Sequence, residues 1–276
     1  MKRLWIFVLV LGACSSDPVV SGAPDVAIDM AADVGHVDTA IDIGNLEDVT
    51  DATTIDAMEV DVSIDVDEPD ANLGVGFGAL DGMCGVLDDE LTDAMPHVLV
   101  NALDFGDDVY DDSDRALLTE GGRTILDEGN AGGSSLFSEL FSYEVLARCE
   151  GAALLKTESN IVYDTEGSIT DYLVQFDETK IGVSVTRVFS FPRDAAFNPE
   201  NARGLVIRKL EDVLESSANV SAGDAWTKQV LHLMTDTDEG AAGLQTLIPN
   251  IDAAIRADTI IVITVTNGDD TPIYEE

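Results

Sequence analysis

The stretch from residue 15 to residue 73 contains no lysine and no arginine, yet it carries 16 acidic side chains. Small or β-branched residues mostly separate aspartates that recur every four or five positions, at Asp25, Asp29, Asp33, Asp38 and Asp42. A segment with no wide apolar face and no balance of charge cannot bury enough surface to fold. We therefore predict an extended, disordered tether over residues 14–75, and a folded part after it.

Repeated aspartates also raise the alternative of calcium binding in the tether. An EF-hand loop needs a glycine and a closing glutamate at fixed spacing, and residues 14–75 lack that pattern. We favour a solvated spacer. The segment resembles the Asp-rich spacers of lipoproteins from myxobacteria and their relatives.

The first 13 residues have the pattern of an export signal. Met1-Lys2-Arg3 is positively charged, and the apolar run from Leu4 to Leu11 is too short to span a bilayer as a mature helix. The run ends in Leu11-Gly12-Ala13-Cys14, which resembles the lipobox of bacterial lipoprotein signal peptides.

This resemblance implies cleavage before Cys14 and a lipid on its sulfur, so that the mature chain is held at a membrane without a transmembrane helix. Ser15, in place of an aspartate, favours the outer membrane over the inner one. We expect an outer-membrane lipoprotein that faces the periplasm or the exterior. The alternative is an ordinary secretory signal followed by a chance cysteine.

The charge of the chain excludes several partners. The 54 acidic and 14 basic side chains give a net charge of −40, and the part after the tether retains 38 acids and 12 bases, a net charge of about −26. Such a surface disfavours nucleic acid and anionic lipid, which both attract basic patches. The apolar fraction of 45% is sufficient for a core. A protein of the cell envelope is the partner that we expect.

Two cysteines remain once Cys14 is assigned to lipid. In an oxidising compartment Cys84 and Cys149 are expected to pair, closing a loop of about 66 residues. The alternative is two buried free thiols.

Residues 76–130 are predicted to form an extension of helices and loops. Val86–Leu103 looks helical, with an interruption at Pro96, and residues 107–114 form an acidic loop. A further short helix is expected over Leu117–Asp127.

Residues 131–276 have a more regular pattern, with helices at 136–146, 198–216 and 238–257. Strands are predicted at 152–157, 169–176, 181–191, 228–234 and 259–266, and residues 160–163 extend the first of them or begin the next. The order αβββαβαβ predicts an α/β sandwich with a mixed sheet. His232, in an apolar strand, is expected to be a core histidine with satisfied hydrogen bonds.

This order resembles the PD-(D/E)xK, or restriction-endonuclease-like, core. In that core a Glu of the first helix, an Asp of the second strand and an acid-x-Lys of the third strand bind a divalent metal. The resemblance places Glu139 and Asp171 in the first two roles. On the third strand, however, Ser184 and Thr186 stand where the acid and the lysine belong. The E-x-K motif is therefore missing, although Glu178-Thr179-Lys180 has its letters at a predicted hairpin turn.

The region from 130 to 276 also resembles a family of uncharacterised proteins from protists and bacteria, which conveys a fold more than an activity. The shared segments are Ser138-Glu139, Lys156-Thr157-Glu158, Thr170-Asp171-Tyr172, Gly182 to Arg187, Lys209-Leu210, Leu231-His232 and Ile273-Tyr274.

Two main functions follow. The first is a tethered, catalytically degenerate nuclease-like domain with a binding or structural role, for which no cofactor is expected. The alternative is a Mg²⁺- or Mn²⁺-dependent nuclease or phosphodiesterase with Glu139, Glu158 and Asp171 as ligands. Its positive charge would come from Lys156, Lys180 or Arg187. Glu139 and Asp171 could equally cap backbone groups or pair with Arg187.

Overall fold

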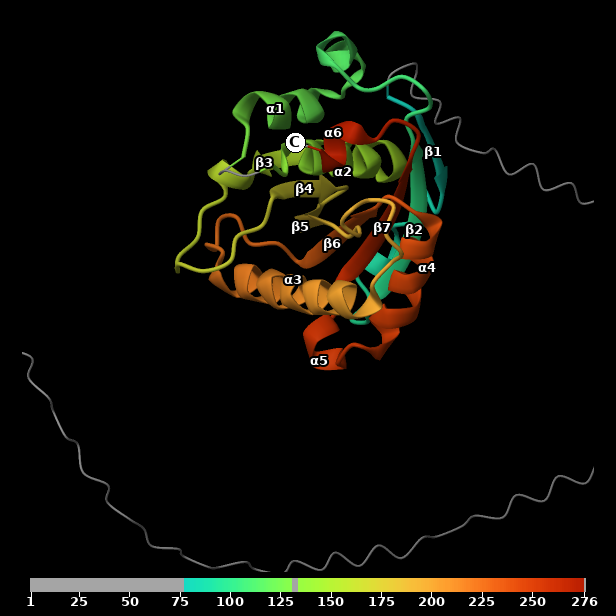
Figure 1. The fold of residues 1–276 in the computed structure, drawn as a ribbon. Coiled ribbons are helices and arrows are strands. Elements are labelled where there is room, and N and C mark those ends of the chain that lie inside the picture. Colours follow the sequence, from blue (N-terminus) through green and yellow to red (C-terminus); the bar gives the residue numbers. More distant parts are fainter. Residues whose placement is uncertain (1–76, 131–133, 276) are drawn as a thin grey trace, which may run out of the picture. The chain divides into compact units, whose positions relative to one another are not determined.

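The computed structural model describes residues 77–130 and 134–275. The predicted signal peptide, Cys14 and the tether lie outside the described residues. The described part is a mixed α/β fold around one seven-stranded sheet (Figure 1). Its strands are β1 (Ala79–Gly82), β2 (His97–Asp104), β3 (Ala153–Thr157), β4 (Tyr172–Phe176), β5 (Thr179–Arg187), β6 (Lys228–Thr235) and β7 (Ile260–Asn267).

The helices lie on both faces of this sheet. They are α1 (Glu120–Glu128), α2 (Leu136–Glu150), α3 (Pro199–Asn219), α4 (Asp238–Leu247), α5 (Ala253–Arg256) and α6 (Thr271–Tyr274). Four short 3-10 turns, η1 to η4, cover Asp89–Leu91, Asp112–Leu117, Glu158–Asn160 and Ile248–Asn250. No helix of the described residues is long and apolar enough to cross a membrane.

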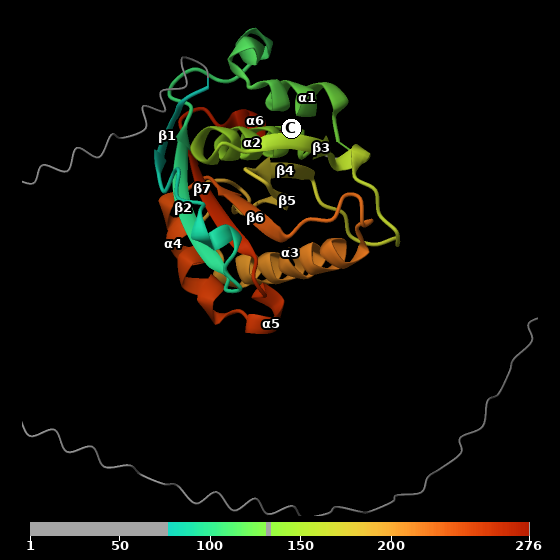
Figure 2. The same ribbon diagram turned by 180° about the vertical axis from the view of Figure 1, so that it is seen from behind.

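The sheet order is β1-β2-β7-β6-β5-β4-β3. The four central strands β2, β7, β6 and β5 run parallel, whereas β1, β4 and β3 pair antiparallel with their neighbours. Helices α1, α2 and α6 cover one face, and α3, α4 and α5 cover the other (Figures 1 and 2). Each face has its own apolar core. Strands β6 and β7 are buried almost throughout because helices cover both of their faces.

The predicted order αβββαβαβ is confirmed from α2 to β7. The local signals explain why. Asn198 caps α3 by accepting hydrogen bonds from the amides of Glu200 and Asn201, with Pro199 at the first helical position. Residues 160–163 are a correction: they form no strand, and only Tyr163 makes a single bridge, to Val220.

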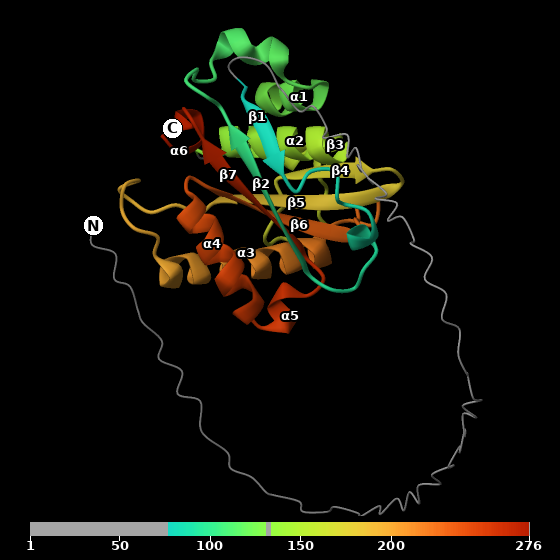
Figure 3. The same cartoon turned by 90° about the vertical axis from the view of Figure 1, so that its right-hand side faces the viewer.

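The predicted helix over Val86–Leu103 is wrong. His97–Asp104 is a strand that pairs in parallel with β7 along its whole length, as Figure 3 shows from that side. Its buried positions alternate at Leu99, Asn101 and Leu103, which is the period of a strand and not of a helix. With β1 added, the segment expected to be a helical extension contributes two strands to the sheet.

A buried polar chain ties α2 to the sheet. The Ser142 hydroxyl lies 2.6 Å from the hydroxyl of Tyr172 and 2.7 Å from Nδ1 of His232. Nε2 of His232 lies 2.6 Å from the hydroxyl of Thr264, which donates to Oδ1 of Asn101. Nε2 must therefore carry the imidazole proton, because Thr264 already uses its own. The prediction of a satisfied core histidine is confirmed, and burial lowers the pKa of His232 to about 3.

A disulfide joins Cys84 to Cys149 at the end of α2, with 4.6 Å between the two Cα atoms. The carboxylate of Glu150 accepts hydrogen bonds from the amides of Gly85 and Leu87 at 3.0 and 2.9 Å. The covalent bond and these two hydrogen bonds fix the segment after β1 to the end of α2.

Reduction of the disulfide should destabilise the domain. The bond spans 65 positions, so the loss of its chain-entropy contribution amounts to about 4 kcal/mol and lowers Tm by about 10 °C. Calorimetric scans of the Cys14→Ser chain with and without reductant test this. Two free thiols in the unfolded, unreduced Cys14→Ser chain would contradict the bond.

Candidate functional site

The site lies where β4 begins and β5 ends, because the two strands are antiparallel neighbours. Asp171 directly precedes β4. Its amide donates to the carbonyl of Val183 at 3.0 Å, and its Oδ2 accepts the amide of Val185 at 2.6 Å. The backbone of β5 therefore holds this carboxyl in place on two sides.

Glu139 occupies the first turn of α2 and is only 4% exposed. Its Oε1 accepts the Ser135 hydroxyl at 2.7 Å and the side-chain amide of Asn130 at 3.1 Å. A buried carboxylate at a helix N-terminus also gains from the helix dipole. The helix start and two side chains thus orient Glu139.

The carboxyl groups of Glu139 and Asp171 interact strongly. Burial, and then the neighbouring Glu139 carboxylate, raise the pKa of Asp171 to about 8. The amide of Val185 and the ammonium group of Lys209 act against this rise, and Glu158 adds to it. Asp171 therefore holds its proton more tightly than an ordinary aspartate does. The structure brings Glu139, Glu158 and Asp171 within electrostatic reach of one another.

Lys209, on α3, is the cation at this site that sequence reasoning did not assign to it. Its place on α3 follows from the crossover between β5 and β6, which no local pattern specifies. The cations that the sequence suggested lie elsewhere. Lys156 pairs with Asp224 at 2.7 Å. Lys180 donates to the carbonyl of Gly223 and stands four residues before Ser184, about 13 Å away along the strand.

Hydroxyl groups occupy the third-strand positions. Ser184 is 5% exposed, and its Oγ lies 3.0 Å from Oγ1 of Thr170. Thr186 is half-buried two residues further on. Glu178 is exposed in the turn between β4 and β5, as predicted, and cannot replace a carboxylate at Ser184.

These residues do not fit a divalent metal as they stand. Mg²⁺ and Mn²⁺ prefer ionised oxygen ligands with free lone pairs. Oδ2 of Asp171 already accepts the amide of Val185, and Oε1 of Glu139 already accepts two hydrogen bonds. The described residues contain no group of three or more His, Cys, Asp or Glu side chains arranged to hold an ion.

Arg187 does not pair with Glu139 or Asp171. Its guanidinium donates to the carbonyl of Ile273 at 2.8 Å and to the hydroxyl of Ser134 at 3.2 Å, just before α2 begins. It therefore flanks the carboxyl pair on the side of α6.

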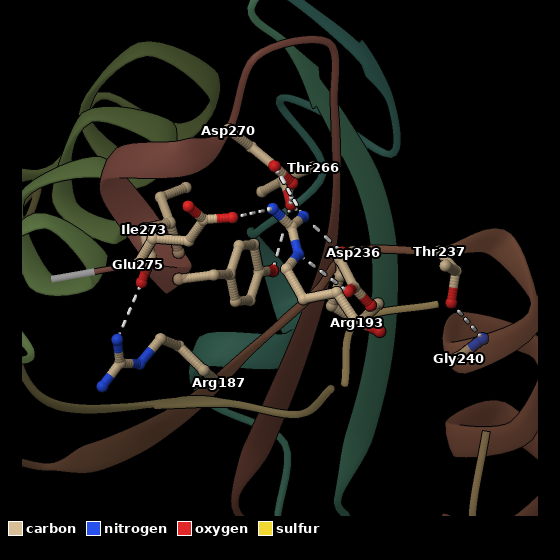
Figure 4. Close-up of polar contacts among 11 residues, drawn as sticks. Arg187, Arg193, Asp236, Thr237, Gly240, Thr266, Asp270, Ile273 and Glu275 are labelled. Carbon is tan, nitrogen blue, oxygen red and sulfur yellow. Dashed lines mark hydrogen bonds and ion pairs between the residues drawn. The ribbon is translucent and has the colours of Figure 1, made fainter. Parts of the chain in front are cut away.

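A second polar cluster follows the carboxyl ends of β6 and β7 (Figure 4). Arg193 reaches Asp270 at 2.6 Å, Asp236 at 3.3 Å and Glu275 at 3.9 Å. Its guanidinium also stacks over the ring of Tyr274, 4.6 Å from the centroid. The sequence alone could not assign Arg193 to this cluster, because its three acidic partners are distant in the chain.

Asp171→Asn should stabilise the domain at high pH. The pKa of Asp171 is higher in the folded chain than in the unfolded chain. Between about pH 4 and pH 8 the folded state therefore keeps a proton that the unfolded chain has already released. Ionisation thus costs stability as the pH rises. Asn keeps the acceptor for Val185 without the charge. We expect a Tm gain of about 2–4 °C at pH 8, which disappears near pH 4.

Thermal scans across this pH range check the prediction. The exposed Asp194→Asn serves as the control and should show no such gain. If the Tm gain of Asp171→Asn grew as the pH fell toward 4, the raised pKa of Asp171 would be refuted.

Comparisons with known proteins give partial similarities. No protein-family model matches the chain. The chain is 39% identical over 153 residues to the AAC-rich mRNA clone AAC4 protein of Dictyostelium discoideum, a match that covers 53% of this chain. It spans only 22% of that relative's length. Among solved structures, SfsA of Pyrococcus furiosus in complex with Ca²⁺ matches 49% of this chain and 57% of its own, with 14% identity and a TM-score of 0.27.

Proposed function

We propose that this chain is an envelope lipoprotein, anchored through Cys14, that displays a catalytically degenerate nuclease-like domain for a binding role. The anchor rests on the export signal and the cysteine that ends it. The nuclease-like assignment rests on the element order, in which α2, β3, β4, β5, α3 and β6 follow the αβββαβ pattern.

The observation that carries the loss of catalysis is the pair formed by Ser184 and Thr170. In the nuclease-like core that this element order resembles, the third strand supplies a charged ligand for the metal. That position instead holds a buried hydroxyl bonded to a second hydroxyl. The third strand therefore offers neither an anionic ligand for a metal nor a lysine beside Asp171 to stabilise a developing anion.

Metal titration and a hydrolysis assay test this proposal. We expect no saturable rise in Tm with millimolar Mg²⁺ or Mn²⁺, and no turnover of a phosphodiester, because a ligand that binds only the folded state must raise Tm. A saturable shift and turnover that vanish in Asp171→Asn, but persist in Asp194→Asn, would overturn the degenerate assignment.

One observation favours a second candidate, a metal-dependent phosphodiesterase. The charges of Glu139, Glu158 and Lys209 all act on Asp171, so three carboxyl groups and one cation lie within electrostatic reach of one another. Under this alternative Lys209 supplies the positive charge, and Lys209→Gln would abolish turnover while leaving metal binding intact.

The anchor has its own test. Cys14→Ser should move the protein from the membrane fraction to the soluble fraction and remove label from an alkyne fatty acid, because the lipid chains supply the attachment. The Cys84→Ser/Cys149→Ser double variant should keep both the label and the membrane association. Equal membrane association of Cys14→Ser and the parent chain would contradict lipid anchoring.

A further inference from the structure

A cavity of 510 Å³ opens at the carboxyl end of β5, next to the start of α2 and beside α6. Neither Glu139 nor Asp171 lines this cavity, and the proposed function does not use it. Ligands of open α/β sheets commonly bind in the crevice beyond the carboxyl ends of the strands. The walls here come from the loop after β5 and from α6.

The walls are largely aromatic. Phe189 and Tyr274 contact each other edge to face, with 5.0 Å between ring centroids. Phe191 also lines the cavity and is 92% exposed, although Phe is a residue that proteins usually bury. An aromatic side chain held at the mouth of an aromatic-walled cavity marks a surface that an apolar group can cover.

Arg193 lines the same cavity, but its charge is already compensated. Asp270, Asp236 and Glu275 lie within 4.0 Å of its guanidinium, and the Tyr274 ring covers one of its faces. Figure 4 shows Asp236 and Asp270 on one side of Arg193 and Glu275 on the other. With three carboxylates around one guanidinium, this cluster is a net acidic wall and does not attract an anion.

Arg187 is different. Among residues 77–130 and 134–275, no carboxylate lies within ion-pair distance of its guanidinium, although the domain carries about three acids for each base. Its two hydrogen bonds go to a carbonyl and a hydroxyl, of Ile273 and Ser134. These bonds orient the guanidinium at the cavity and leave further N–H donors for a ligand. A half-buried, uncompensated arginine favours an anion.

We propose that this cavity binds an amphipathic carboxylate: a small molecule whose carboxylate pairs with Arg187 and whose flat apolar body packs on Phe189, Phe191 and Tyr274. The planar guanidinium matches a carboxylate in a two-bond geometry, and the aromatic walls match a ring or branched chain. The acidic wall around Arg193 sets the orientation, because it repels the carboxylate toward Arg187.

The probe is 2-naphthoate, and its neutral amide, 2-naphthamide, is the matched ligand without charge. Calorimetric titration of the Cys14→Ser chain should show saturable 1:1 binding of the naphthoate, with affinity about tenfold or more above that of the amide. Arg187→Gln should remove this preference and leave the affinity for the amide unchanged. Arg203→Gln, which removes an exposed arginine of α3 and the same charge, should change neither affinity.

Phe191→Ala provides a second test that cannot unfold the core, since this ring is exposed. It should lower the affinities for naphthoate and for the amide to the same degree, because both ligands lose the same apolar contact. Equal affinities for naphthoate and amide, equal effects of Arg187→Gln and Arg203→Gln, or unchanged binding in Phe191→Ala would each overturn the proposal. No saturable binding of naphthoate would overturn it as well.

Discussion

The position of α2 depends on one buried hydrogen-bond chain, from Tyr172 through Ser142 and His232 to Thr264 and Asn101. Each member lies on a different helix or strand, and leaving one buried polar group unpaired costs about 1–3 kcal/mol. A rotation or slide of α2 would break the Ser142 contacts. Glu139 lies three residues before Ser142, and Asp171 directly precedes Tyr172. The hydrogen-bond chain therefore fixes the positions of the two carboxyl groups relative to each other.

Much of the fold could be predicted from local signals. The strands β6 and β7 are continuous apolar runs, and α3 has a cap and a proline at its start. The prediction failed at His97–Asp104, because a short apolar run suits a helix or a strand, and its partner strand β7 lies more than 150 residues away. The same limit applies to the site. Element order brought Glu139 and Asp171 together, but only tertiary packing could assign Lys209 to them.

Charge at the carboxyl ends of the strands is divided unequally. Arg193 meets three acids, whereas Arg187 meets a carbonyl and a hydroxyl, although both arginines line one cavity. The domain is rich in acids, yet among the described residues none forms an ion pair with Arg187. The neighbouring loops therefore place their carboxylates elsewhere. A single chain thus combines a locked ionic cluster, a proton-holding carboxyl pair and an uncompensated cation within one edge of its sheet.

The disulfide has a mechanical consequence. A pull on the N-terminal end of the described chain acts first on Phe77–Gly82, where β1 is an edge strand held by four residue pairs. Once β1 has separated from β2, the force meets Cys84 and passes through the sulfur atoms to Cys149, so the covalent path bypasses residues 85–148. The load then enters the sheet at β3. Under tension the domain can yield β1 without exposing α2, Glu139 or the cavity beside Arg187.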